Sequence, residues 1–250
     1  MPDGPAPRDA HPDLNAKALL VHGRLCDAYG CPVPYFHDLD PLLEVATHTA
    51  LVGCAQMNAI EIHTWNSTRR SIAKPNRLVF DLDPGEGARW THVVEAASLV
   101  RGVLRELGLE AWLKTSGGKG LHVVCPIAAR LEFDVVRDFT RAVVQHLAKT
   151  TPSRFVARSG ASNRIGRIFV DYLRNGFGAT TVSAFSARAR PGLGVSMPID
   201  WNAAGDLEGG AQWTVMTALS HWRSMRKDPW AGYWSCSQTL TQARRLLERL

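Results

Sequence analysis

Apolar and polar side chains recur along this chain with two different periods. Residues 91–107 and 133–149 carry apolar side chains three or four positions apart, and this spacing predicts two amphipathic helices. The stretches 77–83, 121–126 and 167–173 are rich in apolar, β-branched and aromatic residues, which predicts strands. Because helices and strands are mixed without strict alternation, the pattern favours an α/β (α+β) fold with a mixed, mostly antiparallel sheet flanked by helices.

Less regular segments predict shorter elements. We expect further helices, the first of them weakly patterned, at 14–31, 42–57, 213–225 and 239–250, and further strands at 59–63, 110–115, 155–158 and 179–185. Residues 1–13 are rich in Pro, Asp and Gly and are expected to be a disordered leader. No repeat or linker interrupts the pattern, so residues 1–250 are expected to form a single domain.

Composition adds a bias towards anionic partners. The chain has 29 Lys and Arg residues against 23 Asp and Glu, and its formal net charge is +6. This surplus favours a partner such as nucleic acid, although a generally basic surface would give the same count. No apolar run approaches the roughly 18 residues that span a bilayer, and no secretory signal opens the chain, so we expect a cytoplasmic protein without a membrane partner. None of the five cysteines forms a C-x-x-C pair, so neither a disulfide framework nor a zinc ribbon is indicated.

Two predicted strands carry carboxylates. The stretch 77–87, RLVFDLDPGEG, places Asp81 and Asp83 on one face because side chains alternate along a strand. Asp171 lies on the strand in RIFVDYLRN, and pairing of the two strands would bring the three carboxylates together. Such a cluster suits one or two Mg²⁺ or Mn²⁺ ions. The alternatives are a turn or helix cap for the first two aspartates and an arginine partner for the third.

A glycine-rich turn is the second candidate site. Residues 115–122, TSGGKGLH, contain three glycines that let the backbone approach a ligand and expose N–H groups to an anion. Ser116 and Lys119 add a hydroxyl and a cation. The segment is not a Walker A loop, because G-x-x-x-x-G-K-[ST] is absent. Beside a metal cluster it is a candidate triphosphate site, and by itself it fits a plain glycine hairpin.

Four further residues could contact phosphate. His63 follows an apolar stretch in HTWNS, where a histidine can bind phosphate or satisfy a backbone carbonyl. Arg174, Arg188 and Arg190 could stabilise charge on a phosphoryl group, or could simply be solvated.

In combination, these motifs resemble a known family. HTWNS, RLVFDLDPGEG, KTSGGKGLHVV, RIFVDYLRNGFGATTV and SARARPGLGVSMP, in this order, are similar to the polymerase domain of bacterial DNA ligase D, of the archaeo-eukaryotic primase superfamily. The resemblance covers about Val33 to Trp201. It implies a primase-polymerase fold and template-directed addition of nucleotides, often ribonucleotides, to DNA 3′ ends in non-homologous end joining, with Mn²⁺ or Mg²⁺.

The resemblance also implies roles for single residues and partners. Asp81, Asp83 and Asp171 match metal ligands. The positions that match the nucleotide-binding set, chiefly its phosphate contacts, are His63, Ser116, Lys119, His122, Arg174 and Arg190, with Asn175 in the same motif as Arg174. The implied partners are DNA ends or primer-template, nucleoside triphosphates, a Ku-like end-binding protein and a separate DNA ligase, at the bacterial nucleoid.

Two departures from the family pattern leave an alternative open. Thr64 and Asn66 stand where H-P-W-G-S is usual, which we expect to alter loop stiffness more than chemistry. The region before His63 is shorter than the family's, without its basic and aromatic segment for template and 5′-phosphate. The alternative is therefore a catalytically weak or inactive relative that binds DNA ends. A phosphohydrolase of the D-x-D type is disfavoured, because D-x-D-G-[TV] is usual there and Pro84 follows the aspartates here.

Overall fold

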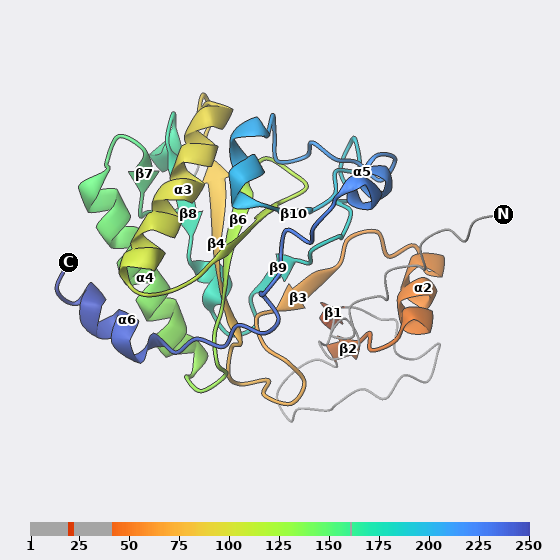
Figure 1. The fold of residues 1–250 in the computed structure, drawn as a ribbon, viewed down its shortest axis with the longest axis horizontal. Helices are drawn as coiled ribbons and strands as arrows, with labels where there is room; N and C mark the ends of the chain where they lie inside the picture. The colour runs from red at the N-terminus through yellow and green to blue at the C-terminus, as the bar shows by residue number, and fades with distance from the viewer. Residues whose placement is uncertain (1–19, 23–41, 161) are drawn as a thin grey trace.

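A six-stranded sheet forms the centre of the protein, in the order β10-β5-β6-β4-β8-β7. The computed structural model describes residues 20–22, 42–160 and 162–250 (Figure 1). The strands of the sheet are β4 (Arg77–Pro84), β5 (Trp112–Thr115), β6 (Leu121–Pro126), β7 (Phe155–Val156), β8 (Ile168–Asp171) and β10 (Pro198–Ile199). All neighbouring pairs are antiparallel except β7 with β8, so the expected mixed, mostly antiparallel sheet is confirmed.

Two long helices, α3 (Trp90–Glu106) and α4 (Phe133–Thr150), pack against one face of this sheet (Figure 1). Leu78, Phe80 and Leu82 of β4 point into the core that the helices complete, and all three are fully buried. Since side chains alternate along a strand, the intervening residues of β4 face the other side. One face of β4 therefore packs in the core, and the other face is available for a functional site.

The remaining elements are short. Two small sheets pair β3 (His63–Trp65) with β9 (Thr180–Val182), and β1 (Leu20–His22) with β2 (Leu42–Glu44). The other helices are α2 (His48–Gln56), α5 (Ala218–Ser224), α6 (Leu240–Leu247) and the 3-10 turns η2 (Ser162–Arg164), η3 (Leu173–Asn175) and η4 (Trp201–Asp206). None of the helices in the described ranges is long and apolar enough to cross a membrane.

The strongly periodic segments fold as predicted. The helices expected at 91–107 and 133–149 are α3 and α4, displaced by one residue at most at either end. The strands expected at 77–83, 121–126 and 167–173 are β4, β6 and β8, although Leu173 belongs to η3. The periodicity predicted these elements because each segment has an apolar face that is stabilised only when it is buried in a common core.

Several weaker predictions are wrong at their boundaries. Residues 42–44 form strand β2, and the helix expected from 42 begins only at His48, where the Thr47 hydroxyl accepts from Ala50 N–H at 3.1 Å. Residues 213–217 are not helical, because their backbone bonds to residues 193–195. Val195 N–H, for example, donates to Trp213 O at 2.7 Å. A strand at 20–22 replaces part of the weak helix pattern at 14–31. The leader expected at 1–13 lies outside the described residues.

The strands expected at 59–63 and 179–185 are both shorter than predicted. Only His63 of the first belongs to β3, because Ile62 N–H donates to the Ser186 hydroxyl at 2.7 Å and not to a neighbouring strand. The second ends at Val182, and Phe185 has a positive φ of 66°, which interrupts extended backbone.

The β4 core face sets a testable stability difference. We expect Leu78→Ala to lower the free energy of unfolding by about 2–5 kcal/mol, because Leu78 is fully buried and the substitution leaves a cavity. The matched control is Leu219→Ala in α5, where the side chain is 56% exposed and the loss should stay within about 0.5 kcal/mol. Chemical denaturation measures both, and equal losses would contradict the assignment of this face to the core.

Candidate active site

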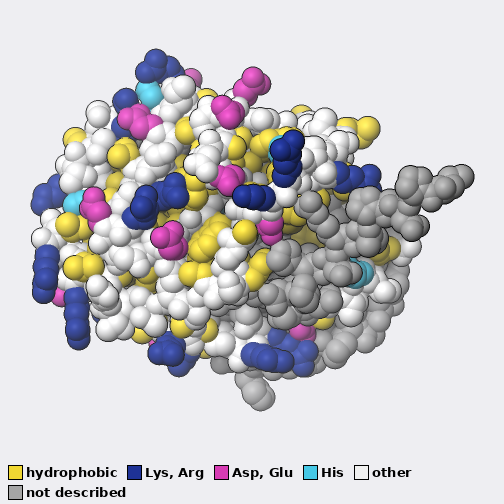
Figure 2. Space-filling model, viewed as in Figure 1, with side chains coloured by type: hydrophobic (Ala, Val, Ile, Leu, Met, Phe, Trp, Pro, Cys, Tyr) yellow, Lys and Arg dark blue, Asp and Glu magenta, His cyan; other side chains and the backbone are white. Residues whose placement is uncertain are grey.

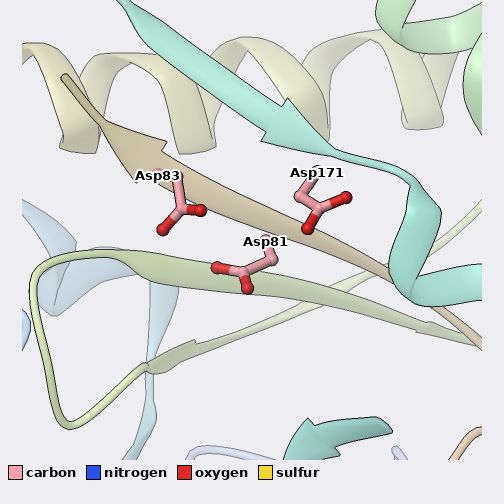
Figure 3. Close-up of side chains that lie close together, drawn as sticks. All are labelled: Asp81, Asp83 and Asp171. Atoms are coloured by element: carbon pink, nitrogen blue, oxygen red, sulfur yellow. The ribbon is translucent and has the colours of Figure 1, made fainter. Parts of the chain in front are cut away.

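Three carboxylates meet on the sheet face turned away from α3 and α4. Asp81 of β4 lies directly opposite Asp171 of β8, and Asp83 follows two residues later on the same face. Their ligand oxygens all lie within 4.8 Å of one another. Figure 3 shows the three side chains pointing toward a common point from the two strands. The predicted convergence is therefore confirmed, and it depends on the β4–β8 register.

Each carboxylate also has a basic neighbour. Arg174 Nε lies 3.1 Å from Asp171 Oδ2 and 3.5 Å from Asp81 Oδ2. His122 Nε2 is 3.2 Å from Asp81 Oδ1, and Arg164 Nη1 is 3.3 Å from Asp83 Oδ2. Two of these groups, His122 and Arg174, belong to the predicted set. Arg164 was not predicted, because its segment, η2, has no motif that would single it out.

The neighbours give the three carboxyls different acidities. Burial alone would raise the pKa of Asp81, but His122, Arg174 and Lys114 outweigh it and lower the pKa to about 2. Burial raises the pKa of Asp83, and the charge of Asp81 raises it further. Burial likewise raises the pKa of Asp171, although Arg174 opposes the shift. A cation placed among them would favour ionisation of all three, because an opposite charge stabilises the carboxylate form.

A row of polar side chains crosses the sheet behind this cluster. The register places Lys114 of β5 opposite His122 of β6, which in turn lies opposite Asp81. Lys114 is 3% exposed, and Nζ donates to Val182 O at 3.0 Å and to the Ser196 hydroxyl at 2.7 Å. Burial lowers the pKa of Lys114 to about 7. Sequence reasoning missed this lysine, since nothing local distinguishes it from a strand residue before the turn.

The glycine turn packs directly against the carboxylate strand. The Ser116 hydroxyl accepts from Gly118 N–H and Gly120 N–H, each at 3.1 Å, so it shapes the turn from within. A Cβ on Gly120 would collide with the Leu82 carbonyl oxygen, so only glycine allows this approach. The Lys119 side chain is exposed at the tip of the turn.

Residues 187–195, in which Ala187 pairs with Val195, form a hairpin that carries Arg188 and Arg190; this arginine hairpin lies over the same turn. Arg188 Nη1 donates to Ser116 O at 3.0 Å, and Arg190 Nη1 would lie 3.6 Å from a Cβ placed on Gly118. The predicted Arg190 is thus brought to the turn that carries Ser116 and Lys119. His63 is connected to Arg188 through Glu61. The Oε1 atom of Glu61 lies 2.6 Å from His63 Nε2 and 2.8 Å from Arg188 Nε.

Asn175 occupies a different kind of position from the one expected. Its side chain is fully buried; Oδ1 accepts from Val79 N–H at 2.8 Å, and Nδ2 donates to Val79 O at 2.8 Å. The amide therefore fastens η3 to β4, and this geometry gives no support to a direct contact with a nucleotide. Its effect is to fix the adjacent Arg174.

Thr64 and Asn66, the two departures from the usual motif, are both engaged. Arg77 Nη2 donates to the Thr64 hydroxyl at 2.8 Å. Asn66 is fully buried, and its Nδ2 donates to Arg174 O at 3.0 Å. Proline and glycine have no side-chain group for these bonds, so the two residues do more than change the stiffness of the loop.

A cavity of about 1000 Å³ opens where β4 ends, beside the glycine turn. Pro84, Lys119 and Arg164 line it together with Trp90 and Gly210, and the three aspartates are not among its lining residues. Its size is in the range of pockets that hold small ligands. The described residues therefore bring together a candidate cation cluster and a glycine turn, with a cavity at the adjoining end of β4.

Comparisons with known proteins match this chain to one family. The family model described as LigD, primase-polymerase domain, matches residues 33–230. The Multifunctional non-homologous end joining protein LigD of Pseudomonas aeruginosa is 46% identical over 206 residues, which are 82% of this chain and 24% of that protein. Its namesake in Mycolicibacterium smegmatis is 34% identical over 166 residues, 66% of this chain and 22% of that protein.

A solved structure has a similar fold. The Polymerase Domain from Mycobacterium tuberculosis Ligase D in complex with DNA superimposes with a TM-score of 0.67 and 26% identity, over 86% of this chain and 74% of that chain. The chain spans about a quarter of the length of the curated relatives that it matches. It belongs to the LigD primase-polymerase domain family.

Proposed function

We propose that this protein is a metal-dependent nucleotidyltransferase that adds nucleotides to DNA 3′ ends opposite a template strand, in double-strand break repair by non-homologous end joining. The observation that carries the proposal is the convergence of Asp81, Asp83 and Asp171 beside the glycine turn, in a chain of the LigD primase-polymerase family. In this reaction the primer 3′-oxygen bonds to the α-phosphorus, the α–β phosphoanhydride bond breaks, and pyrophosphate leaves.

The carboxylate cluster fits Mg²⁺ or Mn²⁺. These ions take oxygen ligands, and three carboxylates offer such ligands within 4.8 Å of one another. When bound, the ion supplies Lewis-acid activation of the 3′-hydroxyl and neutralises charge on the transferred phosphoryl group. Asp81 is ionised throughout the neutral range because its pKa is about 2, so it is ready to bind the cation.

The basic residues account for recognition of the triphosphate. Lys119 and Arg190 lie exposed at the turn, where their charges suit a triphosphate. Arg174 now pairs with Asp81 and Asp171, and a cation at the cluster would free its guanidinium to pair with phosphate. His63 and His122 complete the set that we assign to the nucleotide.

DNA is the proposed second substrate. The net charge of +6 favours a polyanion, and the similar mycobacterial domain is described in complex with DNA. Lys and Arg side chains are spread over the face in Figure 2 and do not gather in one track. The names of the relatives point to end joining, so a Ku-like end-binding protein and a DNA ligase are the expected partners.

The alternative is a non-catalytic relative that binds DNA ends. It predicts salt-dependent DNA binding without nucleotide incorporation. The comparisons do not favour it, and the three aspartates that a polymerase needs are present and assembled. Primer extension by the purified chain would reject it.

Removal of one carboxylate tests the catalytic assignment. We expect Asp81→Asn to lower kcat/KM in a Mn²⁺-dependent primer-extension assay by at least about 10²–10³-fold, a loss typical of a group that stabilises transition-state charge. Chelation of the divalent ion should abolish incorporation by the unmodified chain. The control is Asp138→Asn in α4, whose side chain is 65% exposed and should leave the rate unchanged. Full incorporation by Asp81→Asn would refute the site.

The position of the turn can be tested without changing a charge. A Cβ on Gly210 would lie 2.5 Å from Gly120 O and 2.8 Å from Gly118 O, so Gly210→Ala must displace the turn. We expect KM for the nucleotide to rise about tenfold or more, since small misplacements of binding groups are costly. At the neighbouring Gly209 a Cβ would meet nothing within 4 Å, so Gly209→Ala is the matched control. The same KM in both variants would argue against a triphosphate at this turn.

A further inference from the structure

One carboxylate outside the metal cluster joins several candidate nucleotide-binding residues. Glu61 lies two residues before His63, on the segment that leads into β3. Its Oε1 is 2.6 Å from His63 Nε2 and 2.8 Å from Arg188 Nε, and its Oε2 accepts from Ala189 N–H at 2.8 Å. One carboxylate thus contacts His63 on its own segment and Arg188 and Ala189 on a distant one.

Arg188 extends this connection to the glycine turn. Its side chain is 13% exposed, with Nε facing Glu61 and Nη1 donating to Ser116 O at 3.0 Å. Arg188 begins the hairpin that carries Arg190, and its N–H donates to Gly194 O at 2.8 Å. The guanidinium is therefore held at the turn by its Nη1 hydrogen bond and drawn to Glu61 by the charge of the carboxylate.

The charge of Glu61 is maintained in this setting. Burial would raise the pKa of the carboxyl, but His63, Ala189 N–H and Arg188 together lower it. The group is therefore an anion at neutral pH. Since Glu61 occupies Nε2 of His63, the ring nitrogen left for a ligand is Nδ1.

The fold does not depend on this carboxylate to hold the two segments together. Ile62 N–H donates to the Ser186 hydroxyl at 2.7 Å, and Ser183 N–H donates to Ile62 O at 2.9 Å. These bonds join the same segments beside Glu61. What the carboxylate adds is the orientation of two side chains, His63 and Arg188, whose donors would otherwise lack a shared partner.

We propose that Glu61 is a positioning residue of the nucleotide site, which holds His63 and Arg188 in the orientation that receives a triphosphate at the glycine turn. The proposal rests on the nucleotidyltransferase function proposed above and assigns to that site a residue that touches no reacting atom. Arg188 becomes a triphosphate-binding residue beside Arg190, and Glu61 acts through it.

The first test separates nucleotide binding from folding. Glu61→Gln keeps the shape of the side chain and removes the charge that pairs with Arg188. We expect KM for ATP in primer extension with Mn²⁺ to rise about tenfold, while kcat falls less than threefold and both Tm and DNA affinity stay unchanged. The control is Glu106→Gln at the end of α3, where the side chain is exposed. A purely structural role would instead lower Tm and weaken DNA binding as KM rises. That outcome would overturn the proposal.

A double-mutant cycle tests whether Glu61 acts through Arg188. We expect the rise in KM of Glu61→Ala/Arg188→Ala to be smaller than the product of the two single effects, because the part of the Glu61 effect that passes through Arg188 is lost once Arg188 is gone. Multiplication of the two single effects would overturn the proposal. A lower KM for Glu61→Ala would also overturn it, since Glu61 would then be an anion that competes with the nucleotide.

Failure of the proposed function can be recognised separately. If the unmodified chain incorporates no nucleotide, the nucleotidyltransferase assignment falls, and calorimetric titration with ATP and Mn²⁺ still compares the unmodified chain with Glu61→Gln. A Kd about tenfold weaker in Glu61→Gln supports the positioning role. Equal values, including no binding by either protein, overturn it.

Discussion

The antiparallel pairing of β4 with β8 is the constraint on which the site depends. It sets Asp81 opposite Asp171, which is 90 positions away in the chain, and leaves Asp83 on the same face. A shift of one residue would turn the carboxylate of Asp171 toward the core that α3 and α4 complete. An unpaired charge buried in that core would be strongly destabilising. The apolar packing of the core therefore also selects the observed register.

Charge compensation follows from this pairing. Three carboxylates in so small a space repel one another, and Arg174 and Arg164 offset that repulsion. The result is uneven, with the pKa of Asp81 lowered and those of Asp83 and Asp171 raised. The basic groups that hold the cluster together are also groups suited to bind phosphate. The cluster and the triphosphate site are therefore one electrostatic unit.

The surrounding segments are held to the sheet by buried polar groups. Lys114 joins β5 to β9 through Val182 O, and β9 carries β3 with His63. Asn175 fastens η3 to β4 and so fixes Arg174. Glu61 and Arg188 connect β3, the arginine hairpin and the glycine turn. Each is a hydrogen-bonded or paired group in a site of low exposure, where loss of a partner is expensive.

Sequence alone determined the elements whose apolar period required a common core, among them α3, α4, β4 and β6, and it identified the three aspartates. Motif order was specific enough to suggest the family, because the residues carrying the chemistry stand at strand ends and in turns that local sequence marks. Boundaries such as the start of α2 were not determined, because Thr47 can cap a helix only once the preceding residues are committed to β2.

Only the tertiary structure decided which side chains meet. Asn175 looked like a ligand contact and is a buried link between η3 and β4, whereas Glu61, Lys114 and Arg164 carried no local signal and are part of the site's polar network. Apart from His63, which is two positions from Glu61, their partners lie between 68 and 128 positions away in the chain. The role of a charged residue depends on which distant group satisfies it, and strand register fixes that pairing.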